Sequence, residues 1–358
     1  MIPSIAHALL APEVTPSPSD RNQLLSLLGA LETPPRAADL PNDDAVVAVA
    51  RHHRLTPLLS AACGPHLPVE IGEIFRRDRL ITAARNMLLA GVAEEVVRAL
   101  ATAGVRTIVL KGLDYETRLY HLTGARPTSD IDLLVPDQRR REAFGVLDRL
   151  GFEPRAAAPG FDEPDYHEVA WARKGAEVDL HMALAPLARC RIDYAAVWGE
   201  AEDFDLGQTK TLVLGRRHSA VFHALHMAID HFDVPAIYLV DLAKLLPAAD
   251  DLLAAQETAR RWRCGRPLQT ATALAAAFLP GWAEGMPPIR VTAAARTVIA
   301  EYGTTRRLPR AAQVRRKLQH FDAWSDTVLY TAIQSRRIAK HWIERRVLRR
   351  TARQRLGL

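Results

Sequence analysis

The chain has 358 residues, of which 48% are apolar and 25% are charged, so it is long enough for two or three compact units with a sizeable core. No apolar run approaches the ~18 residues that a membrane span needs, and three dispersed cysteines argue against a disulfide framework. The sequence therefore predicts a soluble, cytoplasmic protein without a transmembrane segment.

The net charge of +6 is unevenly distributed along the chain. Residues 303–358 contain 15 Lys and Arg against three acids, a balance of +12, so the rest of the chain sums to −6. Nine of these basic residues lie in the last stretch, 334–358, with Ile338, Trp342 and Val347 among them. We expect this basic tail either to form a solvated helix face or to meet an acidic partner, a nucleic acid or an anionic membrane surface.

The N-terminal part of the chain is predicted to be helical. Helical periodicity covers residues 21–31 and 43–62, and Asp43 or Asp44 stands near the expected N-cap of the second stretch. A longer helix is expected over residues 71–103. It ends at Gly104, a residue type that favours helix C-termini.

The middle of the chain alternates between strand and helix patterns, and the rest is helical. An apolar strand within residues 103–112 ends in Lys111-Gly112, and a strand with two acids covers residues 129–135. Helices are also predicted at 113–120 and 138–150, and strands at 152–155, at 167–173, around Asp179 and, at the sheet edge, at 212–214. Further helices are predicted at 219–232, 237–247, 250–263, 268–278, 291–302 and 326–358.

The acidic strand carries the clearest chemical pattern. In Ser129-Asp130-Ile131-Asp132-Leu133, the two carboxylates point to one face of an extended strand and the aliphatic residues to the other. Two like charges this close are costly unless a cation or a shared proton relieves their repulsion. Magnesium takes oxygen ligands and commonly joins carboxylates to substrate phosphates, so the pattern predicts a site for phosphate chemistry.

The surrounding motifs resemble a known family. Leu110-Lys111-Gly112, then Arg126 four residues before Asp130-Ile131-Asp132-Leu133-Leu134-Val135, then Val178-Asp179-Leu180-His181 follow the order seen in a bacterial branch of the polymerase-β-like nucleotidyltransferase superfamily. The segments His53-Arg54-Leu55-Thr56-Pro57 and Asp241-Leu242-Ala243 resemble the helical regions of that branch. The resemblance covers about residues 40–250.

The resemblance implies an α+β fold with a small mixed-sheet palm between helical regions. We expect a helical region over residues 1–95, the nucleotidyltransferase palm over 96–215, and a helical region with the basic tail over 216–358. The resemblance also implies a catalytic trio, Asp130, Asp132 and Asp179, that holds Mg²⁺. Two ions are expected, with Mn²⁺ as the alternative metal.

The residues around the trio are candidates for binding the nucleotide. Lys111 is expected either to contact the triphosphate or to pair with the acidic cluster, and Arg126 and Ser129 are expected near phosphate oxygens. Gly112 stands where better-known relatives have Gly-Ser or Gly-Gly, but here Leu113 follows, so a lysine would replace the usual phosphate donor. His181 either orients a carboxylate, contacts substrate, acts as a base or is structural.

The function implied is magnesium-dependent transfer of a nucleoside monophosphate from a nucleoside triphosphate such as ATP to an acceptor hydroxyl, with release of pyrophosphate. The acceptor is left open among a small molecule, a peptide, a protein and an RNA end. A kinase-like phosphotransferase using the same metals is the nearest alternative. A binding protein that holds nucleotide or RNA without turnover is the second.

Overall fold

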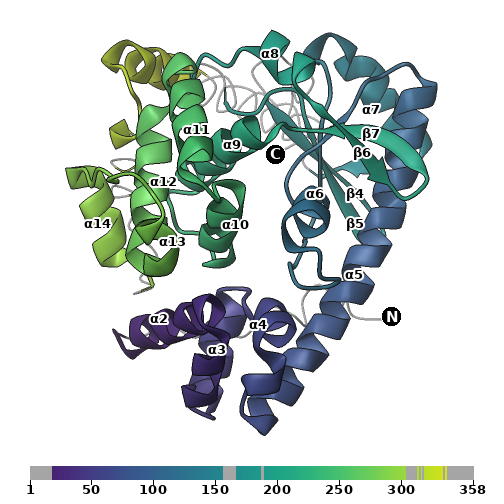
Figure 1. The fold of residues 1–358 in the computed structure, drawn as a ribbon. Helices are drawn as coiled ribbons and strands as arrows, with labels where there is room; N and C mark the ends of the chain where they lie inside the picture. The colour runs from purple at the N-terminus through teal and green to yellow at the C-terminus, as the bar shows by residue number, and fades with distance from the viewer. Residues whose placement is uncertain are drawn as a thin grey trace, which may run out of the picture.

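The computed structural model describes residues 18–155, 167–186, 189–303 and 318–333, together with 313, 316, 335 and 336. Its centre is a mixed sheet of seven strands with helices on both faces, so the predicted α+β class is confirmed (Figure 1). No helix among these residues is long and apolar enough to cross a bilayer. The predicted tail helix lies largely outside the described residues.

The N-terminal helices are α2 (Pro18–Glu32), α3 (Asp44–His52), α4 (Thr56–Cys63) and α5 (Val69–Thr102), with short 3₁₀ turns at Pro34–Asp39 and Gly64–His66. Asp43 caps α3 by accepting a hydrogen bond of 2.8 Å from the Val46 amide. The expected single helix over 43–62 is wrong. The chain turns at Arg54, whose φ is 57°, and α4 starts with Pro57 in its first turn, where the missing amide proton costs nothing.

The sheet has the strand order β3-β4-β5-β2-β1-β7-β6. Its strands are β1 (Ile108–Val109), β2 (Ile131–Leu134), β3 (Glu153–Pro154), β4 (Glu168–Arg173), β5 (Ala176–His181), β6 (Glu202–Leu206) and β7 (Thr209–Val213). The β2–β5 and β1–β7 pairs are parallel and the others antiparallel. The predicted edge strand, β7, instead lies between β1 and the unforeseen β6, which forms the edge.

The helices that follow the first strand complete both layers. They are α6 (Leu113–Tyr115), which continues as a π turn at Glu116–Tyr120, α7 (Arg140–Arg149, after a 3₁₀ turn at Asp137–Arg139), α8 (Tyr194–Gly199), α9 (Arg216–Ile229), α10 (Ile237–Leu245), α11 (Ala249–Arg261), α12 (Gly265–Phe278), α13 (Pro280–Glu284) and α14 (Ala293–Glu301). Helices α8 and α13 were not expected, because each is too short to show a helical period.

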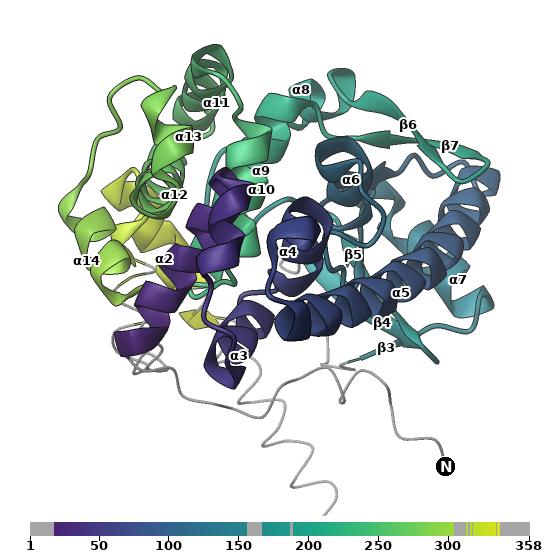
Figure 2. The same cartoon turned by 60° about the horizontal axis from the view of Figure 1, so that its bottom comes forward.

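Two hydrophobic cores follow from the alternation of strand residues. Ile131 and Leu133 of β2 join the core that α5 and α7 cover, whereas Leu134 points to the other face and joins the core of α9–α14. The N-terminal helices contribute to that second core, and Figure 2 shows α2 beside the C-terminal helices. Helix α5 belongs to both cores. The division of the chain into three units stays a prediction.

Candidate active site

The strand register places two of the predicted carboxylates side by side. Asp132 of β2 and Asp179 of β5 are direct partners in the parallel pairing, so both side chains stand on the face that looks toward α9. Asp130 comes just before β2, and the charges of Asp130 and Asp132 both act on Asp179. The structure therefore places Asp132 and Asp179 side by side, with Asp130 near enough for its charge to act on Asp179.

Lys111 pairs with one of these carboxylates. Its Nζ atom donates to both carboxylate oxygens of Asp132 at 2.7 Å, and both side chains are almost completely buried. The lysine arrives here because β1 lies antiparallel to β2 and the chain turns at Gly112, whose φ is 77°. A β-carbon at Gly112 would stand 3.0 Å from the Thr128 methyl group, so this turn also favours glycine by its lack of space.

The charges of the cluster do not balance. Burial alone would raise the pKa of Asp132, but the Lys111 ammonium and the hydrogen bond with His181 hold it well below its usual range. For Asp179, burial and the nearby charges of Asp132 and then Asp130 together raise the pKa to about 7. The charges of His181 and Lys111 thus compensate only in part for the negative charge beside Asp179.

His181 orients the buried carboxylate from the next strand. Its Nε2 atom lies 3.1 Å from Asp132 Oδ1, and its Nδ1 atom lies 3.3 Å from a carboxylate oxygen of Glu168. Burial lowers the pKa of His181, but the bond to Asp132 and the charge of Glu168 outweigh it and raise the pKa. Sequence reasoning missed Glu168, although its place opposite His181 follows from the antiparallel pairing of β4 with β5.

Helices α9 and α10 close the site from above the sheet. The Phe222 ring of α9 meets the His181 ring edge-on with centroids 6.3 Å apart. Burial, together with the nearby Lys111 charge, lowers the pKa of His226 well below its usual range. The Tyr238 ring of α10 stacks on His226 with centroids 5.8 Å apart. A wall of neutral aromatic groups therefore faces the charged strands.

Arg126 does not share the cluster of Lys111. Its guanidinium forms a buried ion pair with Asp241 of α10 at 2.9 Å, and the Tyr120 hydroxyl donates to the same carboxylate at 2.6 Å. Ser129 is exposed, and its hydroxyl lies 3.0 Å from Asp130 Oδ1. Of the predicted phosphate contacts, Lys111 and Ser129 touch the carboxylates, and Arg126 ties the preceding loop to the C-terminal helices.

Comparison with known proteins shows the family of this chain. A family model described as "uncharacterised nucleotidyltransferase" matches residues 40–280, more than half of the chain. The chain belongs to this nucleotidyltransferase family. A search of curated proteins found no match. A solved structure of an antigenic nucleotidyltransferase-like protein from Paracoccidioides brasiliensis is similar at 15% identity and a TM-score of 0.35, covering 56% of this chain and 91% of that one.

The site offers carboxylate oxygens, which are the donors that a hard metal ion prefers. Among the residues that the structure describes, no three His, Cys, Asp or Glu side chains converge closely enough to hold an ion alone. Magnesium, however, usually takes one or two protein carboxylates and completes its shell with water and phosphate oxygens. The raised pKa of Asp179 marks a place where a cation would relieve repulsion. The carboxylates therefore suit an ion that arrives with a phosphate ligand.

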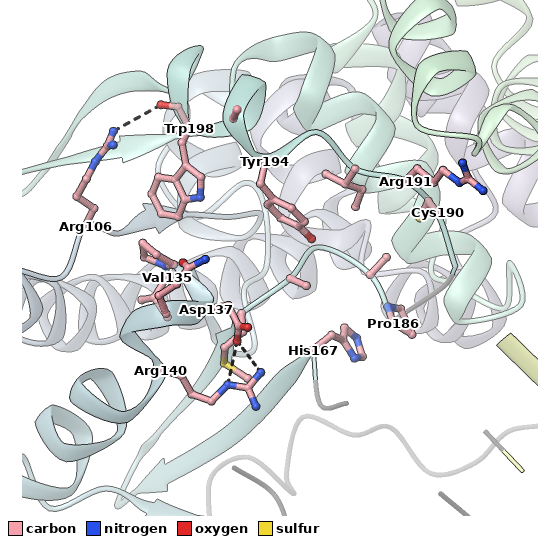
Figure 3. A pocket seen from close by; sticks show the side chains of 17 residues that line it. Arg106, Val135, Asp137, Arg140, His167, Pro186, Cys190, Arg191, Tyr194 and Trp198 are labelled. Atoms are coloured by element: carbon pink, nitrogen blue, oxygen red, sulfur yellow. Dashed lines mark hydrogen bonds and ion pairs between the residues drawn. The ribbon is translucent and has the colours of Figure 1, made fainter. Parts of the chain in front are cut away.

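A cavity of about 720 Å³ lies at the other end of the same strands (Figure 3). Its lining includes Val135 and Met182, just beyond β2 and β5, together with Arg106, Tyr194 and Trp198. None of the three carboxylates lines it. His167 lines the cavity, and its ring centroid lies 6.5 Å from that of His181.

Proposed function

We propose that this member of the family is a magnesium-dependent nucleotidyltransferase that moves a nucleoside monophosphate from a nucleoside triphosphate to an acceptor hydroxyl and releases pyrophosphate. The observation that carries the proposal is the paired register of Asp132 and Asp179, with Asp130 beside them and an excess of negative charge. Such a cluster is expensive in an apoprotein and is expected where a ligand supplies positive charge.

The three carboxylates would hold Mg²⁺, or Mn²⁺ in its place. When bound, the metal would supply positive charge that stabilises the negative charge developing on the phosphates during in-line displacement. Asp179 has a second role in the proposal. Its carboxylate, next to the metal nearer the acceptor, would help to remove the acceptor hydroxyl proton.

Lys111 would change partners when nucleotide binds. Its ammonium is buried against Asp132, so the incoming triphosphate offers the nearest new anion for the same charge. Movement of the ammonium toward the phosphates would leave Asp132 oxygens available to the metal. His181 stays on Asp132 through this exchange and keeps the carboxylate in place. Ser129, exposed beside Asp130, would add a hydrogen bond to the phosphates.

The cavity next to His167 is proposed to hold the body of the acceptor. Its volume of about 720 Å³ lies within the range typical of small-molecule sites, which favours a small acceptor over a protein or an RNA end. Replacing Ala195 on α8 with tryptophan would fill part of this cavity. We expect Ala195→Trp to abolish transfer to the acceptor but to leave nucleotide binding unchanged.

The direct test is pyrophosphate release from each nucleoside triphosphate with Mg²⁺ and candidate acceptors. Asp130→Asn and Asp132→Asn are each expected to lower release by about 10²-fold or more. Asp203→Asn, which changes an exposed strand acid on β6, serves as the matched control and should leave release unchanged. Wild-type rates in both site variants would contradict the proposal.

The same assay separates the two alternatives. A kinase-like phosphotransferase would yield nucleoside diphosphate instead of pyrophosphate. A non-catalytic binding protein would bind nucleotide tightly and would not turn it over with any of the acceptors. The acidic or nucleic-acid partner expected for the basic tail needs its own test, namely binding of full-length protein to RNA over a range of salt concentrations.

A further inference from the structure

The outward side of helix α5 is apolar where a surface helix should be polar. Leu80, Met87 and Leu88 are 59%, 69% and 53% exposed, and Ala84 and Gly91 are exposed between and beyond them. No charged side chain interrupts this stripe over three helical turns, and α5 runs along the outer edge of the molecule (Figure 1). Exposed apolar stripes of this length mark interaction surfaces.

The stripe is complementary to itself when reversed. Leu80 and Gly91 are equally far from the midpoint of the stripe, between Arg85 and Asn86, and so are Ala84 and Met87. In an antiparallel pair of α5 helices, Leu80 of one copy would therefore face Gly91 of the other, and Met87 would face Ala84. Each contact sets a large side chain against a small one. The space beside Gly91 is open, since a β-carbon there would meet nothing within 4 Å.

The charges at the two ends of the stripe follow the same symmetry. Glu73 and Arg98 are both exposed, lie equally far from the midpoint, and form no ion pair with another described residue. Antiparallel pairing would bring Glu73 of each copy to Arg98 of the other, twice across the two-fold axis. A parallel arrangement in register would place like charges together. Charge complementarity thus selects one partner and one direction.

We propose that this α5 face (Glu73, Leu80, Ala84, Met87, Leu88, Gly91 and Arg98) binds a second copy of the chain in an antiparallel, two-fold symmetric dimer. The proposal does not depend on the enzymatic activity proposed above. The α5 face is nevertheless linked to the candidate active site through one side chain. Arg85, next to the stripe, donates to the backbone oxygens of Thr128 and Ser129 at 3.2 and 2.8 Å, directly before Asp130. Dimer formation would therefore steady the loop that precedes the carboxylates.

Sedimentation equilibrium of the full chain across a range of concentrations tests the association. We expect wild-type protein to have twice the mass of one chain. Met87→Glu should weaken the dimer about a hundredfold or more, because it buries an unpaired charge. The matched control is Leu253→Glu, at a 52% exposed leucine of α11, which should leave the mass unchanged. Circular dichroism of each variant establishes that it is folded.

Charge reversal tests the direction of pairing. Glu73→Arg and Arg98→Glu should each weaken the dimer about tenfold, and the double variant should regain wild-type affinity because it restores both pairs. Disulfide formation gives a second readout. A mixture of Ala84→Cys and Met87→Cys proteins should cross-link to each other more than either does to itself. A monomeric wild type, or a dimer indifferent to Met87→Glu, would overturn the proposal.

Discussion

Two buried ion pairs lie on the same side of the sheet but have different surroundings. Arg126 and Asp241 are joined by the Tyr120 hydroxyl, and the guanidinium also donates to the Pro127 carbonyl, so charge and hydrogen bonds are balanced. Lys111 and Asp132 stand beside Asp130 and Asp179. Burial and the charges of Asp132 and Asp130 raise the pKa of Asp179 to about 7. A balanced buried pair serves the fold, whereas a pair with excess charge indicates a ligand site.

The largest expected effect tests the balanced pair. Arg126→Met should lower the free energy of unfolding by about 3–5 kcal/mol, because it leaves the Asp241 carboxylate buried without its cation. The double variant Arg126→Met/Asp241→Leu should recover most of that loss in urea denaturation. It should also bind nucleotide normally. A stable double variant that no longer binds nucleotide would instead make Arg126 a phosphate contact, as the sequence suggested.

The next effect concerns activity and not stability. Asp130→Asn should lower the rate of transfer by about 10²–10³-fold, a typical result of removing one charge-stabilising group from an active site. Asp130 belongs to neither ion pair, so the midpoint of thermal unfolding should stay unchanged. Parallel measurement of pyrophosphate release and thermal unfolding checks both parts. A large loss of stability would mean that Asp130 stabilises the fold, as the Arg126–Asp241 pair does.

His53, a buried ionisable group that forms no ion pair with any residue that the structure describes, sharpens the contrast. His53 accepts a hydrogen bond of 3.2 Å from the Ala236 amide, and burial, helped by His52, lowers its pKa to about 3. As the pH falls, His53 takes up a proton in the unfolded state before it does so in the folded state. Stability that is present above about pH 6.5 is therefore lost as the pH falls toward the pKa of His53 in the folded state. Between pH 7 and 5, wild type should lose roughly 1–2 kcal/mol more than His53→Gln in urea denaturation.

The smallest effect comes from Asp179, and its pH dependence is opposite to that of His53, because stability falls as the pH rises. The raised pKa of Asp179 means that its contribution to stability is present below the unfolded value and is lost as the pH rises through about 7. Asp179→Asn should therefore stabilise the protein by about 1 kcal/mol above pH 7 while removing activity. Denaturation at pH 8 and pH 6 measures this difference. Equal stability at both values would mean that Asp179 is already compensated.

The local patterns in the sequence were sufficient for much of the fold. The 3.6-residue period located α5 to within two residues at its start and one at its end, and alternation located β2, β4 and β5. Strand β6 was missed because Glu202, Asp203 and Asp205 are poor strand formers. Its pairing with β7 overrides that preference, and this pairing is tertiary information.

The site was predictable as a set of residues but not as a set of contacts. Asp130, Asp132 and Asp179 share a recognisable alternation with apolar neighbours, which requires no knowledge of distance. Whether Lys111 meets a phosphate or an aspartate depends on the antiparallel placement of β1 against β2. The Arg126–Asp241 pair joins residues 115 positions apart, and the pattern around either residue carries no sign of the other.

Helix α5 has a consequence for the order in which the molecule folds. Ile71 and Phe75 belong to the core of the helical regions, whereas Leu89, Val96 and Leu100 belong to the core behind the sheet. One continuous helix of about 50 Å thus provides a wall for both cores. Condensation of either core extends the helix into the other and removes its nucleation cost. Both cores should therefore melt in a single calorimetric transition. Backbone amides near Leu80, between the two buried segments of α5, should exchange with solvent before the amides within those segments.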